Sequence, residues 1–88
     1  MTYALITGAS KGIGKWITIE LAKRNNNVLI IARNEEQLAN LSKEIIRDYK
    51  VDCRFLAIDL SENNAPDIVF NWCVENGYDV NIDRKSVV

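Results

Sequence analysis

Three of the chain's four glycines, Gly8, Gly12 and Gly14, lie close together near the N-terminus. They follow the apolar run 3–6, which is typical of a buried parallel strand, and they lead into a stretch with helical periodicity. Gly8 allows a sharp turn where the strand ends, Gly12 leaves the main chain open to a phosphate because it has no Cβ, and Gly14 allows the helix to pack against the strand. The helix's positive end faces the turn. The Gly-x3-Gly-x-Gly spacing therefore favours a binding site for the pyrophosphate of a dinucleotide. The alternative is a flexible loop in which three glycines occur by chance.

Arg33 directly follows a second apolar run, 28–32, which predicts the next parallel strand. In a dinucleotide-binding fold, an acidic residue at this point binds the ribose 2′-OH of NAD, whereas an arginine accommodates the 2′-phosphate of NADP. A solvated arginine at the start of a loop is the alternative interpretation. With the glycine turn in place we favour the phosphate contact, so we expect NADP (NADPH) to be preferred over NAD.

The stretch 7–14 resembles the N-terminal cofactor motif of the short-chain dehydrogenase/reductase family, and the resemblance extends over residues 2–82. It implies a Rossmann fold and a nicotinamide dinucleotide as cofactor. It also implies that the motif lines the adenosine and pyrophosphate half of the site, through Thr7, Gly8, Ser10, Lys11, Gly12, Ile13 and Gly14.

The same resemblance gives roles to Asp59 and Leu60, which follow a third apolar run within 51–58. It implies that the Asp59 carboxylate accepts a hydrogen bond from the exocyclic amine of adenine and that Leu60 covers the ring. The alternative is an ordinary helix cap made by Asp59 or Ser61. Both can hold at once, with Asp59 on the ligand and Ser61 capping.

The elements that position these residues alternate along the chain. A helix is expected from Gly12 to about position 23 or 24, ended by the asparagines 25–27, since asparagine tolerates left-handed backbone. Its predicted core face consists of Ile13, Ile17 and Leu21, with Trp16 packing beside them.

A second helix should begin after Asn34, with Gln37 as its capping-box partner and a core stripe further on. The members of that stripe are Leu38, Leu41, Ile45 and Tyr49. Pro66 falls in the first turn of a third helix, which ends at 75–77, and a fourth strand begins within 78–82. The predicted fold class is α/β: a truncated, partial Rossmann fold with three α/β/α layers and a parallel sheet.

Composition limits the remaining possibilities. The 88 residues have a net charge of −1 and a hydrophobic fraction of 48%, which is typical of one small globular domain without a basic face for nucleic acid. No apolar run is long enough for a membrane span and no signal peptide is recognisable, so we expect a cytoplasmic chain. Cys53 and Cys73 should be buried free thiols, and with no histidine present we expect no metal site.

The chemistry of the resembling family is not found in this chain. Its reductases use a tyrosine as general acid and base, with a lysine four residues later. None of Tyr3, Tyr49 or Tyr78 has a lysine at that spacing, so we predict no catalytic residue. The charged run in 83–88 does not suit a buried strand. We therefore divide the chain into a Rossmann half-domain, 1–82, and a divergent tail, 83–88, which is a truncation, a shifted reading frame or a genuine short tail.

These observations predict the N-terminal fragment of an NADP-dependent short-chain oxidoreductase whose carbonyl or alcohol substrate is unknown. Two alternatives stay open: a non-catalytic NADPH-binding module, and a non-functional fragment that binds nothing. A methyltransferase fits less well because such sites prefer an acidic residue where this chain has Arg33. The third helix alone should cover one face of the sheet incompletely, which favours self-association through that face.

Overall fold

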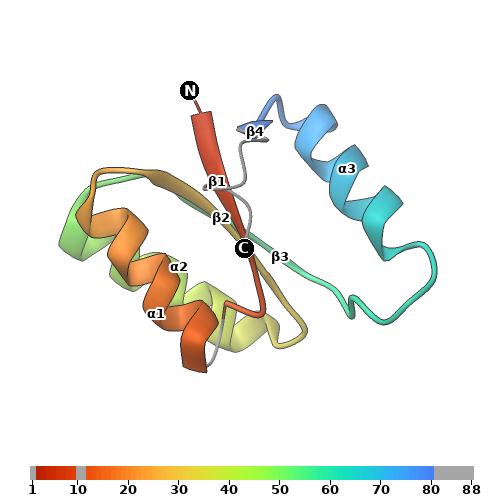
Figure 1. Cartoon of the computed structure of the whole chain (residues 1–88), viewed down its shortest axis with the longest axis horizontal. Helices are drawn as coiled ribbons and strands as arrows, with labels where there is room; N and C mark the ends of the chain where they lie inside the picture. The colour runs from red at the N-terminus through yellow and green to blue at the C-terminus, as the bar shows by residue number, and fades with distance from the viewer. Residues whose placement is uncertain (1, 10–11, 81–88) are drawn as a thin grey trace.

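The computed structural model describes residues 2–9 and 12–80, in which strands and helices alternate (Figure 1). The strands are β1 (Thr2–Thr7), β2 (Asn27–Ala32), β3 (Cys53–Ala57) and β4 (Asp79–Val80), and the helices are α1 (Gly12–Lys23), α2 (Glu35–Tyr49) and α3 (Ala65–Glu75). All strand pairs are parallel, and the strand order is β3-β2-β1-β4. The predicted α/β class and parallel sheet are confirmed. The tail predicted for 83–88 and the end of the fourth strand lie outside the described residues.

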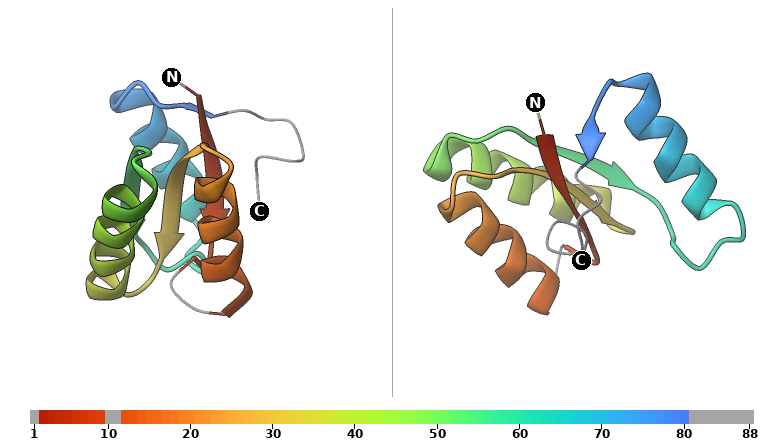
Figure 2. Two further views of the ribbon diagram at one scale, coloured as in Figure 1. Left: turned by 90° about the vertical axis from the view of Figure 1, so that its left-hand side faces the viewer. Right: turned by 45° about the horizontal axis from the view of Figure 1, so that its top comes forward.

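The helices form two layers around the sheet, with α1 and α2 on one face and α3 on the other (Figure 2). Right-handed crossovers require this arrangement, because the chain reverses its direction of travel across the sheet after β3. The larger core lies under α1 and α2 and contains Leu38, Leu41 and Ile45 from the predicted stripe of α2. The smaller core lies under α3, where Cys73 packs against Tyr3 and Leu29.

Strand β2 runs through the centre of the sheet and faces helices on both sides. The side chains of Val28, Leu29, Ile30 and Ile31 are completely buried. A parallel strand covered on both faces needs a continuous apolar run rather than an alternating one, and this strand was predicted from that pattern.

The α3 face of the sheet is covered unevenly. Leu29 and Ile31 on this face are completely buried, whereas Leu5, Leu56 and Ile58 are half-buried. Most of the large exposed apolar side chains belong to the helices instead: on α3, Phe70 is 68% exposed and Val74 is 61% exposed. Apolar surface is therefore exposed on the outer side of α3 more than on the sheet itself.

The predicted core face of α1 is wrong in part. Ile13 is 77% exposed and Trp16 is 63% exposed, while the buried residues of this helix are Thr18 and Ala22. Together with Gly14 these form a stripe of small residues at i, i+4 and i+8. The helix presents its small side chains to the sheet, and Thr18 Oγ1 donates a hydrogen bond to the Gly14 carbonyl at 2.8 Å instead of leaving its hydroxyl unpaired.

The end of α1 and the start of α3 are formed by the residues predicted for them. Asn25, at φ +66°, takes the left-handed conformation predicted for the asparagine run after α1. Pro66 occupies the first turn of α3 as predicted. Lys50 also has a left-handed backbone, at φ +55°, where it caps α2 through a hydrogen bond from its N–H to the Ile46 carbonyl.

Asp52 joins three strands at their amino ends. Its N–H donates to Asn27 Oδ1 at 2.9 Å, its carboxylate accepts from the Tyr3 hydroxyl, and Arg54 Nε lies 3.0 Å from Asp52 Oδ1. Tyr3 packs against Tyr78 with ring centroids 5.0 Å apart. This polar and aromatic cluster stabilises the end of the sheet opposite to the glycine turn.

The two cysteines are buried free thiols, as predicted. Within residues 2–9 and 12–80, no group of three or more Cys, Asp or Glu side chains is placed to hold a metal ion. No helix in this part of the chain has the length and apolar character needed to cross a bilayer.

Candidate functional site

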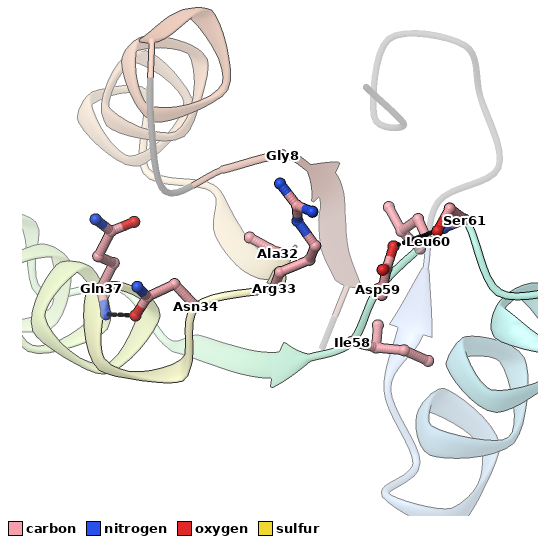
Figure 3. A pocket seen from close by; sticks show the side chains of 9 residues that line it. All are labelled: Gly8, Ala32, Arg33, Asn34, Gln37, Ile58, Asp59, Leu60 and Ser61. Atoms are coloured by element: carbon pink, nitrogen blue, oxygen red, sulfur yellow. Dashed lines mark hydrogen bonds between the residues drawn. The ribbon is translucent and has the colours of Figure 1, made fainter.

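A cavity of about 660 Å³ opens at the carboxyl ends of β1, β2 and β3 (Figure 3). In open parallel sheets ligands bind at this edge, because the loops that follow the strands meet there. Three segments far apart in the sequence line the cavity, contributing Gly8, Ala32, Arg33, Asn34, Gln37, Ile58, Asp59, Leu60 and Ser61.

The first segment is the glycine turn. Gly8, at φ +64°, and Gly12, at φ +57°, take conformations that L side chains rarely adopt, and a Cβ on either would meet no atom of the described residues within 4 Å. A Cβ on Gly14 would instead lie 2.2 Å from the Gly8 carbonyl oxygen. Gly12 thus leaves the turn open, and Gly14 allows α1 to approach the end of the strand, as predicted.

Backbone hydrogen bonds hold the three loops together. The Gly8 N–H donates to the Ile31 carbonyl at 2.7 Å, and the Ile58 N–H donates to the Ala32 carbonyl at 2.8 Å. Each bond continues the parallel pairing past the end of a strand, so the first residues of the loops have fixed positions. The cavity is therefore built on sheet geometry rather than on free loops.

Arg33 extends from the end of β2 over the cavity, toward the side at which Gly8 lies (Figure 3). Its side chain is exposed, and no carboxylate in the described part of the chain lies within ion-pair distance of it. The guanidinium therefore presents its planar set of N–H donors to a ligand without competition.

Asp59 lies across the cavity from Arg33. Its Oδ1 accepts hydrogen bonds from the Ser61 hydroxyl at 2.7 Å and from the Ser61 N–H at 2.9 Å. These two bonds, together with the positive charge of Arg33, hold the pKa of the Asp59 carboxyl below its usual value. The carboxylate is thus ionised at neutral pH and can accept a hydrogen bond from a ligand amine. Leu60, 41% exposed, stands beside it with an apolar surface.

The prediction that Ser61 caps the following helix is wrong. Helix α3 begins at Ala65 and its N-cap residue is Asn64, which makes no side-chain cap hydrogen bond. Ser61 bonds back to Asp59 instead, because Asp59 accepts two local donors in the tight turn that follows β3.

The remaining predicted residues lie beside the cavity or outside the description. Thr7 ends β1 and Ile13 lies in the first turn of α1, where it is largely exposed, so both stand next to the glycine turn. Ser10 and Lys11, which were predicted to contact the cofactor, lie outside the described residues.

Gln37 lines the cavity although it was predicted only as a helix-capping residue. The first of the two capping-box hydrogen bonds is present, since the Gln37 N–H donates to Asn34 Oδ1 at 3.0 Å. This bond confirms Asn34 as the N-cap residue. The reciprocal bond from the Gln37 side chain is absent, and its buried Oε1 has no hydrogen-bond partner among the described residues. The capping-box prediction is therefore half wrong, because the side chain leaves the helix end and faces the cavity.

Comparison with known proteins shows the family to which nearly the whole chain is similar. A family model described as short chain dehydrogenase matches residues 2–82. The chain is 41% identical over 85 residues to the very-long-chain 3-oxoacyl-CoA reductase of Kluyveromyces lactis, which covers 97% of this chain and 25% of that protein.

Solved structures with similar folds include two dehydrogenases. A 7beta-hydroxysteroid dehydrogenase superposes with a TM-score of 0.83 at 32% sequence identity. The match covers 91% of this chain and 30% of the dehydrogenase chain. The alcohol dehydrogenase of Thermococcus sibiricus, solved with 5-hydroxy-NADP, superposes with a TM-score of 0.85 at 28% identity, covering 92% of this chain and 34% of its own.

The fold is a partial Rossmann-type α/β fold, with a cavity at the carboxyl ends of its parallel strands. The chain belongs to the short-chain dehydrogenase family, whose members bind a nicotinamide dinucleotide. It spans about a quarter of the length of its Kluyveromyces lactis relative and about a third of the two structures.

Proposed function

We propose that this chain is the NADP-binding N-terminal part of a short-chain oxidoreductase that interconverts a carbonyl and an alcohol. The observation that carries the proposal is Arg33, which extends over the cavity at the end of β2 where an NAD site would hold a carboxylate. The cofactor-bound structure of the Thermococcus sibiricus enzyme and the reductase name of the Kluyveromyces lactis relative support it.

The residues present fit the cofactor. The turn at Gly12 is open where a Cβ would stand, so a pyrophosphate can approach the backbone N–H groups at the start of α1. Arg33 would bind the 2′-phosphate, and Asp59 with Leu60 would hold the adenine. When bound, the nicotinamide ring supplies hydride transfer to or from the substrate carbon. The residues of this chain bind and orient the adenosine end of the dinucleotide.

The test is the choice of cofactor. A charge-assisted hydrogen bond contributes about 1.5–3 kcal/mol, so Arg33→Ala should weaken NADPH binding roughly 10- to 150-fold. NADH binding should stay nearly unchanged, because NADH has no 2′-phosphate. Titration followed by NADPH and NADH fluorescence measures both affinities. The matched control is Arg24→Ala, which removes an exposed arginine at the end of α1, far from the cavity.

Arg33→Asp extends this test. A carboxylate at position 33 repels the 2′-phosphate and offers an acceptor to the ribose 2′-OH, so NADPH should weaken further while NADH binds more tightly. Equal weakening of both cofactors by Arg33→Ala, or equal affinity of the unmodified chain for both, would refute NADP preference.

A non-catalytic NADPH-binding module is the second candidate, and the positions of the tyrosines fit it as well as they fit the first candidate. Tyr3 and Tyr78 pack together at the amino ends of the strands, and Tyr49 ends α2, so none of them lines the cavity. We expect the purified chain not to oxidise NADPH with a panel of ketones and aldehydes above the protein-free rate. Turnover that survives repurification would refute this expectation. The remaining alternative is a non-functional fragment, which requires that neither NADPH nor NADH binds.

Self-association is part of the proposal. The predicted surface for association is the α3 face of the sheet, where Leu5, Leu56 and Ile58 are half-buried. The exposed apolar side chains on α1 and α3, including Trp16 and Phe70, add further surface of the kind that drives association. Light scattering coupled to size exclusion should show species larger than a monomer, and a monodisperse monomer at high concentration would refute it.

We also propose a cytoplasmic location, which two unpaired buried cysteines suit. Imaging of a tagged chain tests the location.

A further inference from the structure

We propose that Gln37 binds the adenosine ribose, accepting a hydrogen bond from a ribose hydroxyl through its side-chain Oε1. This inference rests on the proposed function, because it concerns the same cavity and the same class of ligand. It adds a third polar contact at the adenosine end, which recognises the sugar, beside Arg33 on the 2′-phosphate and Asp59 on the adenine.

The position of Gln37 is fixed by the start of α2. Its N–H is held by Asn34 Oδ1 at 3.0 Å, so the backbone cannot move away from the loop that carries Arg33. Figure 3 shows the Gln37 and Arg33 side chains extending in the same direction, toward the side of the cavity at which Gly8 lies. The two residues therefore flank the place where a ribose would enter.

The hydrogen bonding of Gln37 is incomplete without a ligand. Its Oε1 is the single buried side-chain polar atom without a partner in residues 2–9 and 12–80. By contrast, the buried hydroxyls of Thr18 and Ser42 each donate to a carbonyl, at 2.8 and 2.9 Å. Native structures leave few such atoms unpaired, and each exception calls for an explanation, such as a bound water, an ion or a functional contact.

The unpaired atom selects the ligand chemistry. An amide oxygen needs a donor, and the ionised 2′-phosphate of NADP has none to offer. The adenosine ribose keeps its 3′-hydroxyl as a donor in both cofactors, whatever stands at its 2′ position. Arg33 and Gln37 therefore divide the recognition, with the cation on the phosphate and the amide oxygen on the sugar.

The experiment compares NADPH and NADH binding to the unmodified chain and to Gln37→Met, which keeps the side-chain length and helix propensity but removes the amide. A neutral hydrogen bond is involved, so both affinities should fall roughly 2- to 12-fold. Gln37→Glu keeps the acceptor but adds a negative charge, so it should weaken NADPH more than NADH. The matched control is Asn40→Met on the next turn of α2, which lines a smaller neighbouring cavity together with Gln37 but not the cavity at the strand ends, so it should change neither affinity.

Thermal melting without ligand separates a binding role from a structural one. Replacing an unpaired buried acceptor by an apolar group costs no hydrogen bond, so Gln37→Met should melt at or above the temperature of the unmodified chain. A lower melting temperature would show that the amide supports the fold and would overturn the inference. This measurement requires no cofactor.

The remaining outcomes are distinct. Unchanged affinities in Gln37→Met would overturn this inference and leave the proposed function standing. A loss confined to NADPH would also overturn it, since the amide would then donate to the phosphate. Failure of the unmodified chain to bind either cofactor would refute the proposed function, and this inference with it.

Discussion

At the scale of single residues, Gly12 and Gly14 are required for different physical reasons. Gly12 has a left-handed backbone with open space around it, so a side chain there meets conformational strain alone. Gly14 has a clash, because an added Cβ would lie 2.2 Å from the Gly8 carbonyl oxygen and 2.7 Å from its carbonyl carbon. Backbone atoms cannot turn aside as a flexible side chain can, so the start of α1 would have to shift.

We predict that Gly14→Ala destabilises the chain by about 3 kcal/mol or more, at the upper end of the cost of overpacking. Gly12→Ala should cost about 1–2 kcal/mol, the strain of a left-handed alanine. Urea unfolding followed by circular dichroism gives both values. If the two variants lose equal stability, the close contact between α1 and the turn does not limit the fold.

At the scale of elements, the ends of the helices are set by left-handed residues. Asn25 suits that role, since its short polar side chain tolerates the conformation, whereas Lys50 carries a long side chain at φ +55°. The strain at Lys50 persists because Val51 and Cys53, which follow immediately, are buried in the core and fix the path of the chain.

Lys50→Gly should therefore stabilise the chain by about 0.5–1 kcal/mol, since glycine takes this conformation without strain. The control is Lys43→Gly in the middle of α2, which should destabilise by about 1 kcal/mol because glycine lowers helix propensity. Thermal melts of the two variants should shift in opposite directions. A loss of stability in both would show that the left-handed cap is not strained.

At the scale of the whole molecule, the sheet holds two weakly acidic groups in their protonated forms. Burial, then the hydrogen bond to Asp52, raises the pKa of Tyr3 to about 12 from its ordinary value of 10.0. Burial raises the pKa of the Cys53 thiol to about 11 from 9.0. Both groups are neutral in the folded chain at pH values where the unfolded chain has begun to ionise.

We predict that the free energy of unfolding falls as the pH rises from about 9 to 12. In this range the folded state binds more protons than the unfolded state, so the slope is negative; below pH 9 the contribution is fully present. Melting temperatures at closely spaced pH values measure the slope. Tyr3→Phe removes one of the two groups, so its curve should be flatter between pH 10 and 12. Parallel curves for the two chains would contradict the assignment to Tyr3.

The sequence alone determined the features that depend on local patterns. The apolar run of β2, the glycine spacing and the alternation of strand and helix predicted the parallel sheet and placed Gly8, Arg33 and Asp59 after the ends of strands. These predictions hold because strand burial, turn geometry and helix capping each depend on a few neighbouring residues.

Only the tertiary structure decided how those pieces face one another. Hydrophobic periodicity assigned Ile13 to the core, with Trp16 packing beside it, but the close approach of α1 to the sheet selects the small residues Gly14, Thr18 and Ala22 instead. The sequence predicted Gln37 only as a helix-capping residue. The tertiary structure shows that it also lines the cavity, together with Arg33 and Gly8. The rotation of a helix and the direction of a side chain depend on distant partners, which the spacing of residues along one segment does not record.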